Sequence, residues 1–272
     1  DNWGMMRLMG IVNVTPDSFS DGGLYLDVGR AIEHGRGLVA DGADIVDIGG
    51  ESTRPGAAEV AADEEARRTT PVVAGLAAEG IEVSIDTSKA EVAGAALDAG
   101  AGMVNDVTAL GADPELAAVC AERGCEVVLM HMQGTPRTMQ ADPTYGDVVD
   151  DVRAFLSERI AFAVGEGIAE ERIWVDPGIG FGKTVEHNLE LLRRLGELHC
   201  LGRPIVIGTS RKTFIGRLTG RDVDARLGGT IATNVLALRS GAEMLRVHEV
   251  REVREAALVT RAVAQGRAWA PA

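Results

Sequence analysis

A short pattern repeats along the chain and limits the folds that it can adopt. In each copy, a stretch with helical spacing ends at a glycine, a short turn follows, and an apolar run comes next that a polar residue closes. Glycine just after a helix supplies the left-handed conformation that other residues adopt only at a cost. A short, nearly continuous apolar run is typical of a strand buried on both faces. The repeat therefore predicts alternating helices and parallel strands.

Eight apolar runs are predicted to be strands: 8–14, 45–48, 83–85, 103–104, 127–130, 173–175, 205–207 and 244–247. Helical periodicity appears between them, for example at 28–40, 63–78, 148–164 and 227–238. Eight strand–helix units predict an α/β fold of the (β/α)8 TIM-barrel type, which needs about 250 residues. A doubly wound open sheet is the alternative, because alternation alone does not decide whether the sheet closes. No linker or composition shift divides the chain, so we expect a single domain over residues 1–272.

Charge and cysteine content exclude several classes of protein. The chain has 41 Asp and Glu against 27 Lys and Arg, a net charge of −14 that repels nucleic acid. No apolar run approaches the ~18 residues that span a membrane, and no secretion signal begins the sequence. Cys120, Cys125 and Cys200 are an odd set without a CxxC pair, which argues against disulfides and a zinc site. We expect a cytoplasmic protein that binds neither nucleic acid nor membrane.

Polar residues close the apolar runs in all eight units. They are Asn13, Asp47, Asp86, Asn105, His131, Asp176, Ser210, and the pair Arg246 and His248. In a barrel, the carboxyl ends of the strands share one face, where the loops that follow them build the active site. Polar residues that merely end strands explain one such position but not eight. We expect these side chains to meet at one rim.

The polar residues suit different roles. Asp86 and Asn105 would accept hydrogen bonds from the ring N–H and amino groups of a fused heterocycle, whereas Ser88 and Asp106 are better interpreted as caps. His131 has no HExxH or cysteine partner and is interpreted as structural.

A GKT triplet at residues 182–184 suggests a nucleotide-binding P-loop, but the surrounding residues reject it. Pro177 stands where the first glycine of that motif belongs, and Val185 breaks the GxGxxG alternative. What remains is Asp176 at a strand end, followed by a turn that displays Phe181.

The last two units form the best candidate for an anion pocket. Arg246 and His248 are two positions apart, so both can face the barrel mouth, where barrels commonly bind phosphate. The neutral amide oxygen of Asn13 suits a hard cation that already carries phosphate ligands, although a capping role for Asn13 is equally compatible with its loop.

Taken in order, the motifs closely resemble those of the dihydropteroate synthases, enzymes of folate biosynthesis. The matching segments are NVTPDSFSDGG, DIGGESTRPG, IDTSK, NDV, MHMQGTPRTMQ, DPGIGFGK, SRK and RVHEV, between residues 10 and 249. The resemblance implies a Mg²⁺-dependent transferase that joins 6-hydroxymethyl-7,8-dihydropterin diphosphate to p-aminobenzoate, giving 7,8-dihydropteroate and pyrophosphate. It also implies a sulfonamide target.

The same resemblance implies a role for individual residues. The implied pterin site is Asp86, Asn105, Asp176 and Lys212. The implied p-aminobenzoate site is Thr53, Pro55, Phe181, Ser210 and Thr213. The implied pyrophosphate site is Asn13, Arg54, Arg246 and His248, with Asn13 also holding the metal. Asp86, Lys212, Arg246 and His248 are the implied catalytic residues. Many members have Ser in place of Thr213 and Asp in place of Glu249, and both changes keep the chemical group.

Three alternatives stay open. A methyltetrahydrofolate-binding methyltransferase barrel shares the pterin acceptors but leaves the anion pocket unexplained. A non-catalytic pterin-binding paralogue would not need intact loop motifs. A sugar-phosphate lyase would need a Schiff-base lysine at the end of an inward-facing run, and the sequence has none. Apolar positions within 227–238 and 250–263 are compatible with a homodimer or with packing against the barrel.

Overall fold

The computed structural model describes residues 6–15, 24–53 and 56–266, which form eight parallel strands and nine α-helices. The strands are β1 (Arg7–Asn13), β2 (Ile45–Gly49), β3 (Val83–Asp86), β4 (Met103–Asp106), β5 (Glu126–Met130), β6 (Ile173–Asp176), β7 (Val206–Ile207) and β8 (Met244–Val247). The helices are α1 (Leu24–Ala40), α2 (Ala62–Ala77), α3 (Ala90–Asp98), α4 (Leu116–Arg123), α5 (Val148–Gly165), α6 (Val185–Arg193), α7 (Thr213–Thr219), α8 (Leu227–Arg239) and α9 (Val250–Gln265). None of these helices combines the length and apolar character needed to cross a bilayer.

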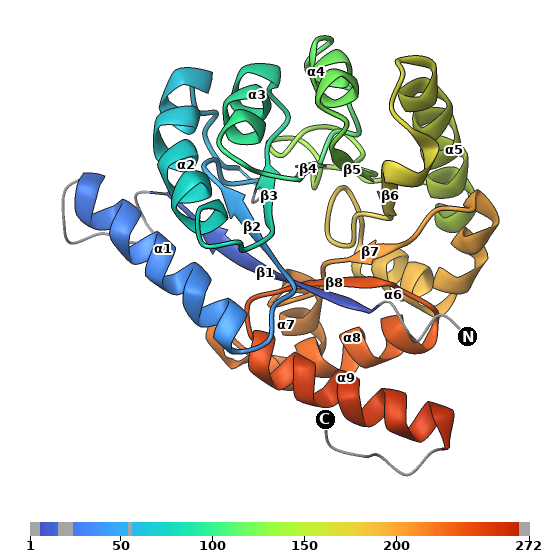
Figure 1. Ribbon diagram of the computed structural model, residues 1–272. Helices are drawn as coiled ribbons and strands as arrows, with labels where there is room; N and C mark the ends of the chain where they lie inside the picture. Colours follow the sequence, from blue (N-terminus) through green and yellow to red (C-terminus); the bar gives the residue numbers. More distant parts are fainter. Residues whose placement is uncertain (1–5, 16–23, 54–55, 267–272) are drawn as a thin grey trace.

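The sheet curls into a nearly closed barrel. Its strand order is β6-β5-β4-β3-β2-β1-β8-β7, so the first strand pairs with both the second and the last. The two ends of this order meet through a parallel bridge between Val175 and Ile205, and the Val175 amide donates to the carbonyl of Pro204 at 3.0 Å. The helices lie outside the strands (Figure 1). The predicted barrel is confirmed, and the open-sheet alternative is wrong.

The glycines of the repeat end helices as predicted. Gly124 caps α4 with φ +60°, and Gly202 caps the 3₁₀-helix Leu195–Leu201 with φ +67°. An L side chain in this left-handed conformation is strained, so glycine ends each helix and directs the chain back to the next strand.

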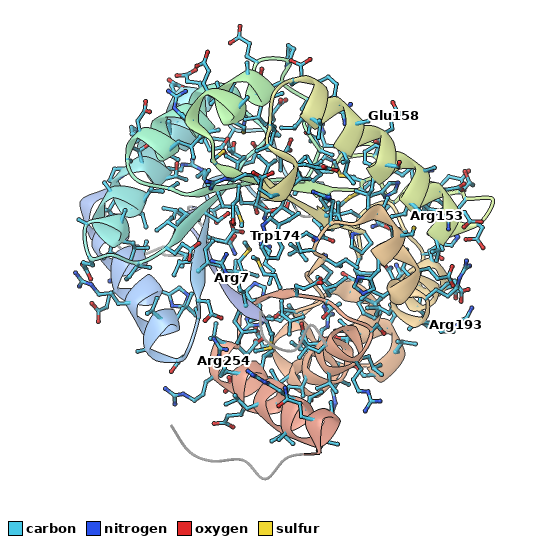
Figure 2. The ribbon with its side chains drawn as sticks, turned by 45° about the vertical axis from the view of Figure 1, so that its right-hand side comes forward. Arg7, Arg153, Glu158, Trp174, Arg193 and Arg254 are labelled. Carbon is cyan, nitrogen blue, oxygen red and sulfur yellow. The ribbon has the colours of Figure 1, made fainter. Side chains whose placement is uncertain are left out.

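The barrel interior begins with an apolar layer near the amino ends of the strands. Its members are Met9, Ile45, Met103, Val128, Trp174, Val206 and Met244. None is more than 9% exposed. Figure 2 shows Trp174 inside the ring of helices, while Arg153 and Glu158 lie on its outside. Since side chains alternate along a strand, residues two positions later face the same interior one step nearer the carboxyl ends.

Candidate active site

A polar layer lies directly above the apolar one. Ile45, Ser84, Met103, Trp174 and Met244 are each followed two positions later by a charged or amide side chain. These side chains are Asp47, Asp86, Asn105, Asp176 and Arg246, and the first four are 0%, 8%, 7% and 7% exposed. The structure therefore brings together, at the carboxyl ends of five strands, side chains that are far apart in the sequence.

Arg246 is the centre of this layer. Its Nε donates to Asp47 Oδ2 at 2.6 Å, and its Nη2 donates to Asp86 Oδ2 at 2.7 Å. Asn105 Nδ2 donates to the same Asp47 oxygen at 3.2 Å, so the carbonyl oxygen of that amide is left to accept from a ligand. From the sequence, Arg246 was predicted to bind an anionic ligand. In the structure its charge is matched by two carboxylates.

The Asp86 carboxyl titrates close to neutral pH. Burial raises its pKa to about 7, against the opposing effect of the Arg246 charge, and the carboxylates of Asp47 and Glu65 add to the rise. Perturbed carboxyls of this kind gather at catalytic sites.

Lys212 lies close to Arg246, just before α7. Its Nζ donates to the carbonyl of Ile179 and lies 4.5 Å from the centre of the Phe181 ring. A Cβ built on Gly208, just after β7, would lie 4.0 Å from Lys212 Nζ and 3.7 Å from Arg246 Cβ. The lysine and the arginine thus flank the same short segment of backbone.

Asp176 and Lys212 influence each other across this opening. Asp176 Oδ1 accepts from the amide of Gly178 at 2.7 Å. Burial raises the pKa of Asp176, and the charge of Lys212 opposes that rise. Burial lowers the pKa of Lys212 to about 8, and Asp176 opposes that fall. The mouth therefore holds two carboxyls and one amine whose pKa values have moved toward neutrality.

Ser210 and His248 form a separate polar pair at the ends of β7 and β8. Ser210 Oγ lies 2.9 Å from His248 Nδ1 and donates to Glu249 Oε2 at 3.1 Å. Arg211 Nε donates to the other oxygen of Glu249. The resemblance assigned Ser210 to p-aminobenzoate and His248 to pyrophosphate, whereas the structure places the two side chains in contact.

Asn13 completes the mouth at the end of β1. A Cβ on Gly49 would lie 3.6 Å from Asn13 Oδ1 and 3.8 Å from Asp86 Oδ2, so the amide and the carboxylate face the same point across β2. Within the described residues, no group of three or more His, Cys, Asp or Glu side chains could hold a metal. One neutral protein oxygen fits Mg²⁺ that takes its remaining ligands from phosphate and water.

The other predicted residues lie further out or outside the described ranges. Thr53 is partly buried in the loop after β2, and Thr213 is exposed at the start of α7. In the described part of the chain, no hydrogen bond joins either of them to the Arg246 cluster. Arg54 and Pro55 lie outside the described residues.

The sequence did not predict a second buried ion cluster beside the mouth. Lys89 Nζ pairs with the carboxylates of Glu51 and Glu65, and Glu65 is only 1% exposed. Glu51 Oε1 also accepts from the amide of Val60 at 3.1 Å, which joins the two ends of the loop between them. The one available signal was a lysine in the short loop after a predicted strand of a strongly acidic chain.

Known proteins resemble this chain over most of its length. A family model described as "Pterin binding enzyme" matches residues 9–248. A dihydropteroate synthase of Escherichia coli K12 is 46% identical over 257 residues, covering 94% of this chain and 91% of that protein. The Xanthomonas albilineans dihydropteroate synthase solved with 4-aminobenzoic acid is 48% identical, with a TM-score of 0.91 and coverage of 96% and 94%. A structure of the X. albilineans enzyme with 7,8-dihydropteroate has 45% identity, a TM-score of 0.87 and coverage of 96% and 95%.

Proposed function

Because the chain belongs to the pterin-binding enzyme family and, within it, to the dihydropteroate synthases, we propose that it is the transferase that makes 7,8-dihydropteroate in folate biosynthesis. It joins 6-hydroxymethyl-7,8-dihydropterin diphosphate to p-aminobenzoate and releases pyrophosphate. One observation carries the proposal. At the carboxyl ends of the strands, Arg246 donates hydrogen bonds to both Asp47 and Asp86, and Asn105 donates to the same Asp47 oxygen as Arg246.

The pterin ring is assigned to the acceptors of the polar layer. Its ring N–H and amino groups need fixed oxygen acceptors, which Asp86, Asn105 and Asp176 supply from β3, β4 and β6. Lys212 supplies a donor for a ring acceptor. Because these groups are buried and already oriented by Arg246, Asp47 and Gly178, a planar heterocycle meets an ordered site.

p-Aminobenzoate is assigned to the Phe181 side of the mouth. The Phe181 ring supplies an apolar face, and the Lys212 ammonium lies 4.5 Å from its centre. Thr53, Ser210 and Thr213, at the loops after β2 and β7, are also assigned to this substrate. Pro55, which lies outside the described residues, is assigned to it as well.

The diphosphate is assigned to the Asn13 and His248 side, with Arg54 and Arg246. Mg²⁺ held by Asn13 would neutralise charge on the departing pyrophosphate. Two carboxylates occupy the guanidinium of Arg246. His248, which lies 2.9 Å from Ser210 Oγ, is therefore assigned as a further side chain for the leaving group.

The reaction breaks the bond between the pterin methylene carbon and the diphosphate oxygen. A new bond forms between that carbon and the amine nitrogen, which then loses a proton to solvent. Asp86 is assigned the role of stabilising, by its negative charge, the positive charge that develops on the methylene carbon and the ring. No covalent intermediate with the protein is needed.

A pyrophosphate-release assay tests the proposal. We expect release only when pterin diphosphate and p-aminobenzoate are both present. A methyl-transferring barrel would release no pyrophosphate, and a non-catalytic pterin-binding protein would bind the pterin without turnover. Calorimetric titration of pyrophosphate with and without Mg²⁺ tests the metal assignment, and equal affinity in both titrations would contradict it.

We further propose that the chain acts as one domain, in the cytoplasm, as a homodimer. The three cysteines are unpaired, as a reducing compartment favours. Leu236, Val259 and Val263 on α8 and α9 are 57%, 64% and 69% exposed, which is unusual for large apolar side chains that remain in water. Sedimentation velocity at micromolar concentration would show a monomer if the last proposal is wrong.

A further inference from the structure

A buried lysine with no assigned role lies beneath the mouth. Lys183 is in the loop between β6 and α6 and is only 3% exposed. Its Nζ lies 2.8 Å from His131 Nδ1 and donates to the carbonyls of Phe181 at 2.9 Å and His131 at 3.4 Å. Three polar atoms thus surround the Lys183 amine. Burial lowers the pKa of this amine well below its ordinary value, and the charge of Asp176 opposes that fall. Isolated buried ammonium groups are costly, so this arrangement has to be maintained by its partners.

His131 is a matched acceptor for this lysine. It follows β5, is 6% exposed, and packs edge-on against Phe155 with ring centres 4.8 Å apart. Burial, with a smaller contribution from the charge of Lys183, lowers the pKa of His131 to about 3. The imidazole is therefore neutral at ordinary pH, and its Nδ1 shares a hydrogen bond with the Lys183 amine.

The loops after β5 and β6 meet at this pair without spare room. A Cβ on Gly178 would overlap the carbonyl oxygen of His131, and a Cβ on Gly182 would lie 2.6 Å from the carbonyl oxygen of Gln133. Both glycines have positive φ, +69° and +62°. Since backbone packs directly on backbone here, the Lys183 contacts fix the path of residues 178–182 against the loop after β5.

The path of residues 178–182 also determines which of their atoms contact Lys212. Lys212 Nζ donates to the carbonyl of Ile179 and sits over the ring of Phe181. A Cβ on Gly180 would lie 3.0 Å from Lys212 Cδ. One side of the loop thus contacts Lys183, and the other contacts Lys212 through three consecutive residues.

We propose that Lys183 is a positioning residue for p-aminobenzoate: by tying the Phe181 carbonyl to His131, it sets the position of the Phe181 ring. The proposal rests on the proposed function. Removing the lysine amine leaves His131 Nδ1 and the Phe181 carbonyl without a buried donor, so the loop has to shift to find other partners. The pterin acceptors Asp86 and Asn105 belong to a different network, and Asp176 is anchored on β6, so the pterin site should change less than the p-aminobenzoate side.

The test compares the change in the KM for p-aminobenzoate with the change in the KM for pterin diphosphate. We expect Lys183→Met, which keeps the length and removes the amine, to raise the KM for p-aminobenzoate about tenfold or more, and the KM for pterin diphosphate less than about threefold. His131→Leu removes the acceptor and should give the same split. His131→Asn places an oxygen near the position of Nδ1 and should restore the KM for p-aminobenzoate to within about threefold of the wild-type value.

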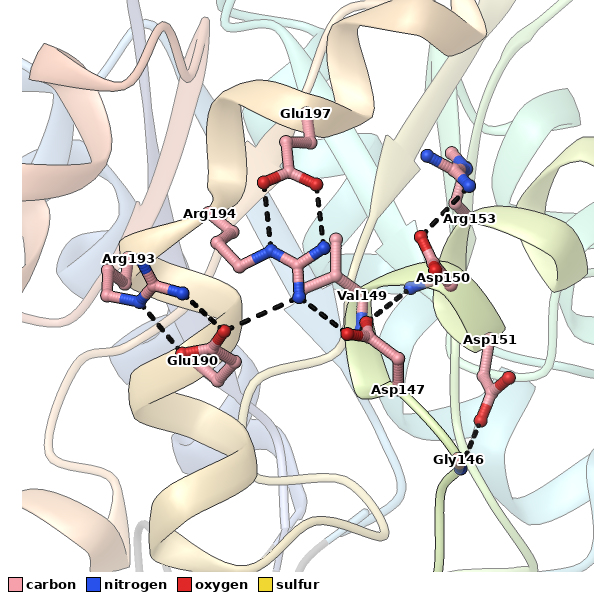
Figure 3. A network of polar contacts seen from close by, with 10 residues as sticks. All are labelled: Gly146, Asp147, Val149, Asp150, Asp151, Arg153, Glu190, Arg193, Arg194 and Glu197. Atoms are coloured by element: carbon pink, nitrogen blue, oxygen red, sulfur yellow. Dashed lines mark hydrogen bonds and ion pairs between the residues drawn. The ribbon is translucent and has the colours of Figure 1, made fainter.

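A matched control separates positioning from a general loss of stability. Arg194, after α6, is bonded to Glu197 and to Asp147, the residue that caps the start of α5 (Figure 3). Arg194→Met should lower the melting temperature without changing either KM. If Lys183→Met does not fold, the two His131 variants carry the test.

Equal changes in both KM values, or an unchanged KM for p-aminobenzoate in a folded variant, would overturn the proposal. Wild-type turnover is measured first. Wild-type protein that does not turn over the two substrates contradicts the proposed function instead, so the two failures are distinguishable.

Discussion

The two layers of the barrel interior are built on the same strands and have opposite character. Residues Ile45, Met103, Trp174 and Met244 form an apolar layer, and two positions later the same strands carry carboxylates, an amide and a guanidinium. The first layer gains free energy by leaving water. The second loses hydration and recovers it only through pairing, as Arg246 does with Asp47 and Asp86. The residues that stabilise the fold and the residues proposed for the reaction are therefore two positions, or about 7 Å, apart along each strand.

The largest expected effect is on the polar layer. Asp86→Asn should lower kcat/KM at least about 100-fold, because a neutral amide cannot balance positive charge on the pterin methylene. The melting temperature should not fall, because Arg246 keeps Asp47 as a partner at 2.6 Å. Steady-state kinetics and thermal unfolding measure the two quantities. A kcat within about twofold of the wild-type value would remove Asp86 from the mechanism.

Asp106 is the matched control for that substitution. It is the last residue of β4, as Asp86 is of β3, and it is completely buried. Its neighbour Asn105 faces the mouth, whereas the Asp106 carboxylate accepts from the amides of Thr108 and Leu110 at 2.8 and 2.5 Å. Asp106→Asn should therefore lower stability and leave kcat within about threefold. If Asp86→Asn and Asp106→Asn change kcat and stability alike, the side of the strand on which a carboxylate lies does not decide whether it serves catalysis or stability.

The apolar layer should respond in the opposite way. Met103→Ala removes a side chain that is 1% exposed, and we expect the free energy of unfolding to fall by about 2–5 kcal/mol. Met103→Leu nearly conserves the volume and should cost less than about 1.5 kcal/mol. Urea unfolding gives both values. A Met103→Ala protein that keeps its stability but loses affinity for the pterin would show that the layers are not independent.

The pH dependence of the rate sharpens the same contrast. The pKa of Asp86 is raised to about 7 and that of Lys212 is lowered to about 8. If both must be charged, log kcat/KM falls by about one unit per pH unit below 7 and above 8. Asp86→Asn should remove the acidic limb of any residual activity. A profile that is flat from pH 5 to pH 10 would exclude both groups.

Stability should follow a different pH course. Between pH 4 and pH 7 the folded state keeps the Asp86 proton that the unfolded chain loses, so this group lowers the free energy of unfolding as pH rises. Above pH 8 the unfolded chain keeps the Lys212 proton that the folded state loses, so this group raises the free energy of unfolding until about pH 10.5. Denaturant unfolding at several pH values gives the free energy of unfolding as a function of pH. Comparison with Asp86→Asn and Lys212→Met shows how much of that dependence each group contributes.

The sequence predicts the strands of the fold better than it predicts the contacts made by loops and by side chains across the barrel. The eight apolar runs became the eight strands because burial on both faces demands continuous apolar residues. The polar residues after them came together because parallel strands share an end. The partners of Arg246 could not be predicted, since Asp47 is 199 residues away and the pairing depends on barrel closure. The Lys183 contact with His131 depends on two loop conformations, for which periodicity provides no information.

The smallest expected effect lies outside the barrel. Arg194 donates to both oxygens of Glu197 at 2.8 Å and to Asp147 Oδ2 at 2.7 Å, and Asp147 itself caps the start of α5 (Figure 3). Exposed ion pairs contribute little because water screens them and long side chains lose freedom. Arg194→Met should therefore lower the melting temperature by no more than about 3 °C and leave kcat and the pH profile unchanged. A larger fall, reduced by high salt in the wild-type protein, would mean that this helix contact supports the barrel as much as the apolar layer does.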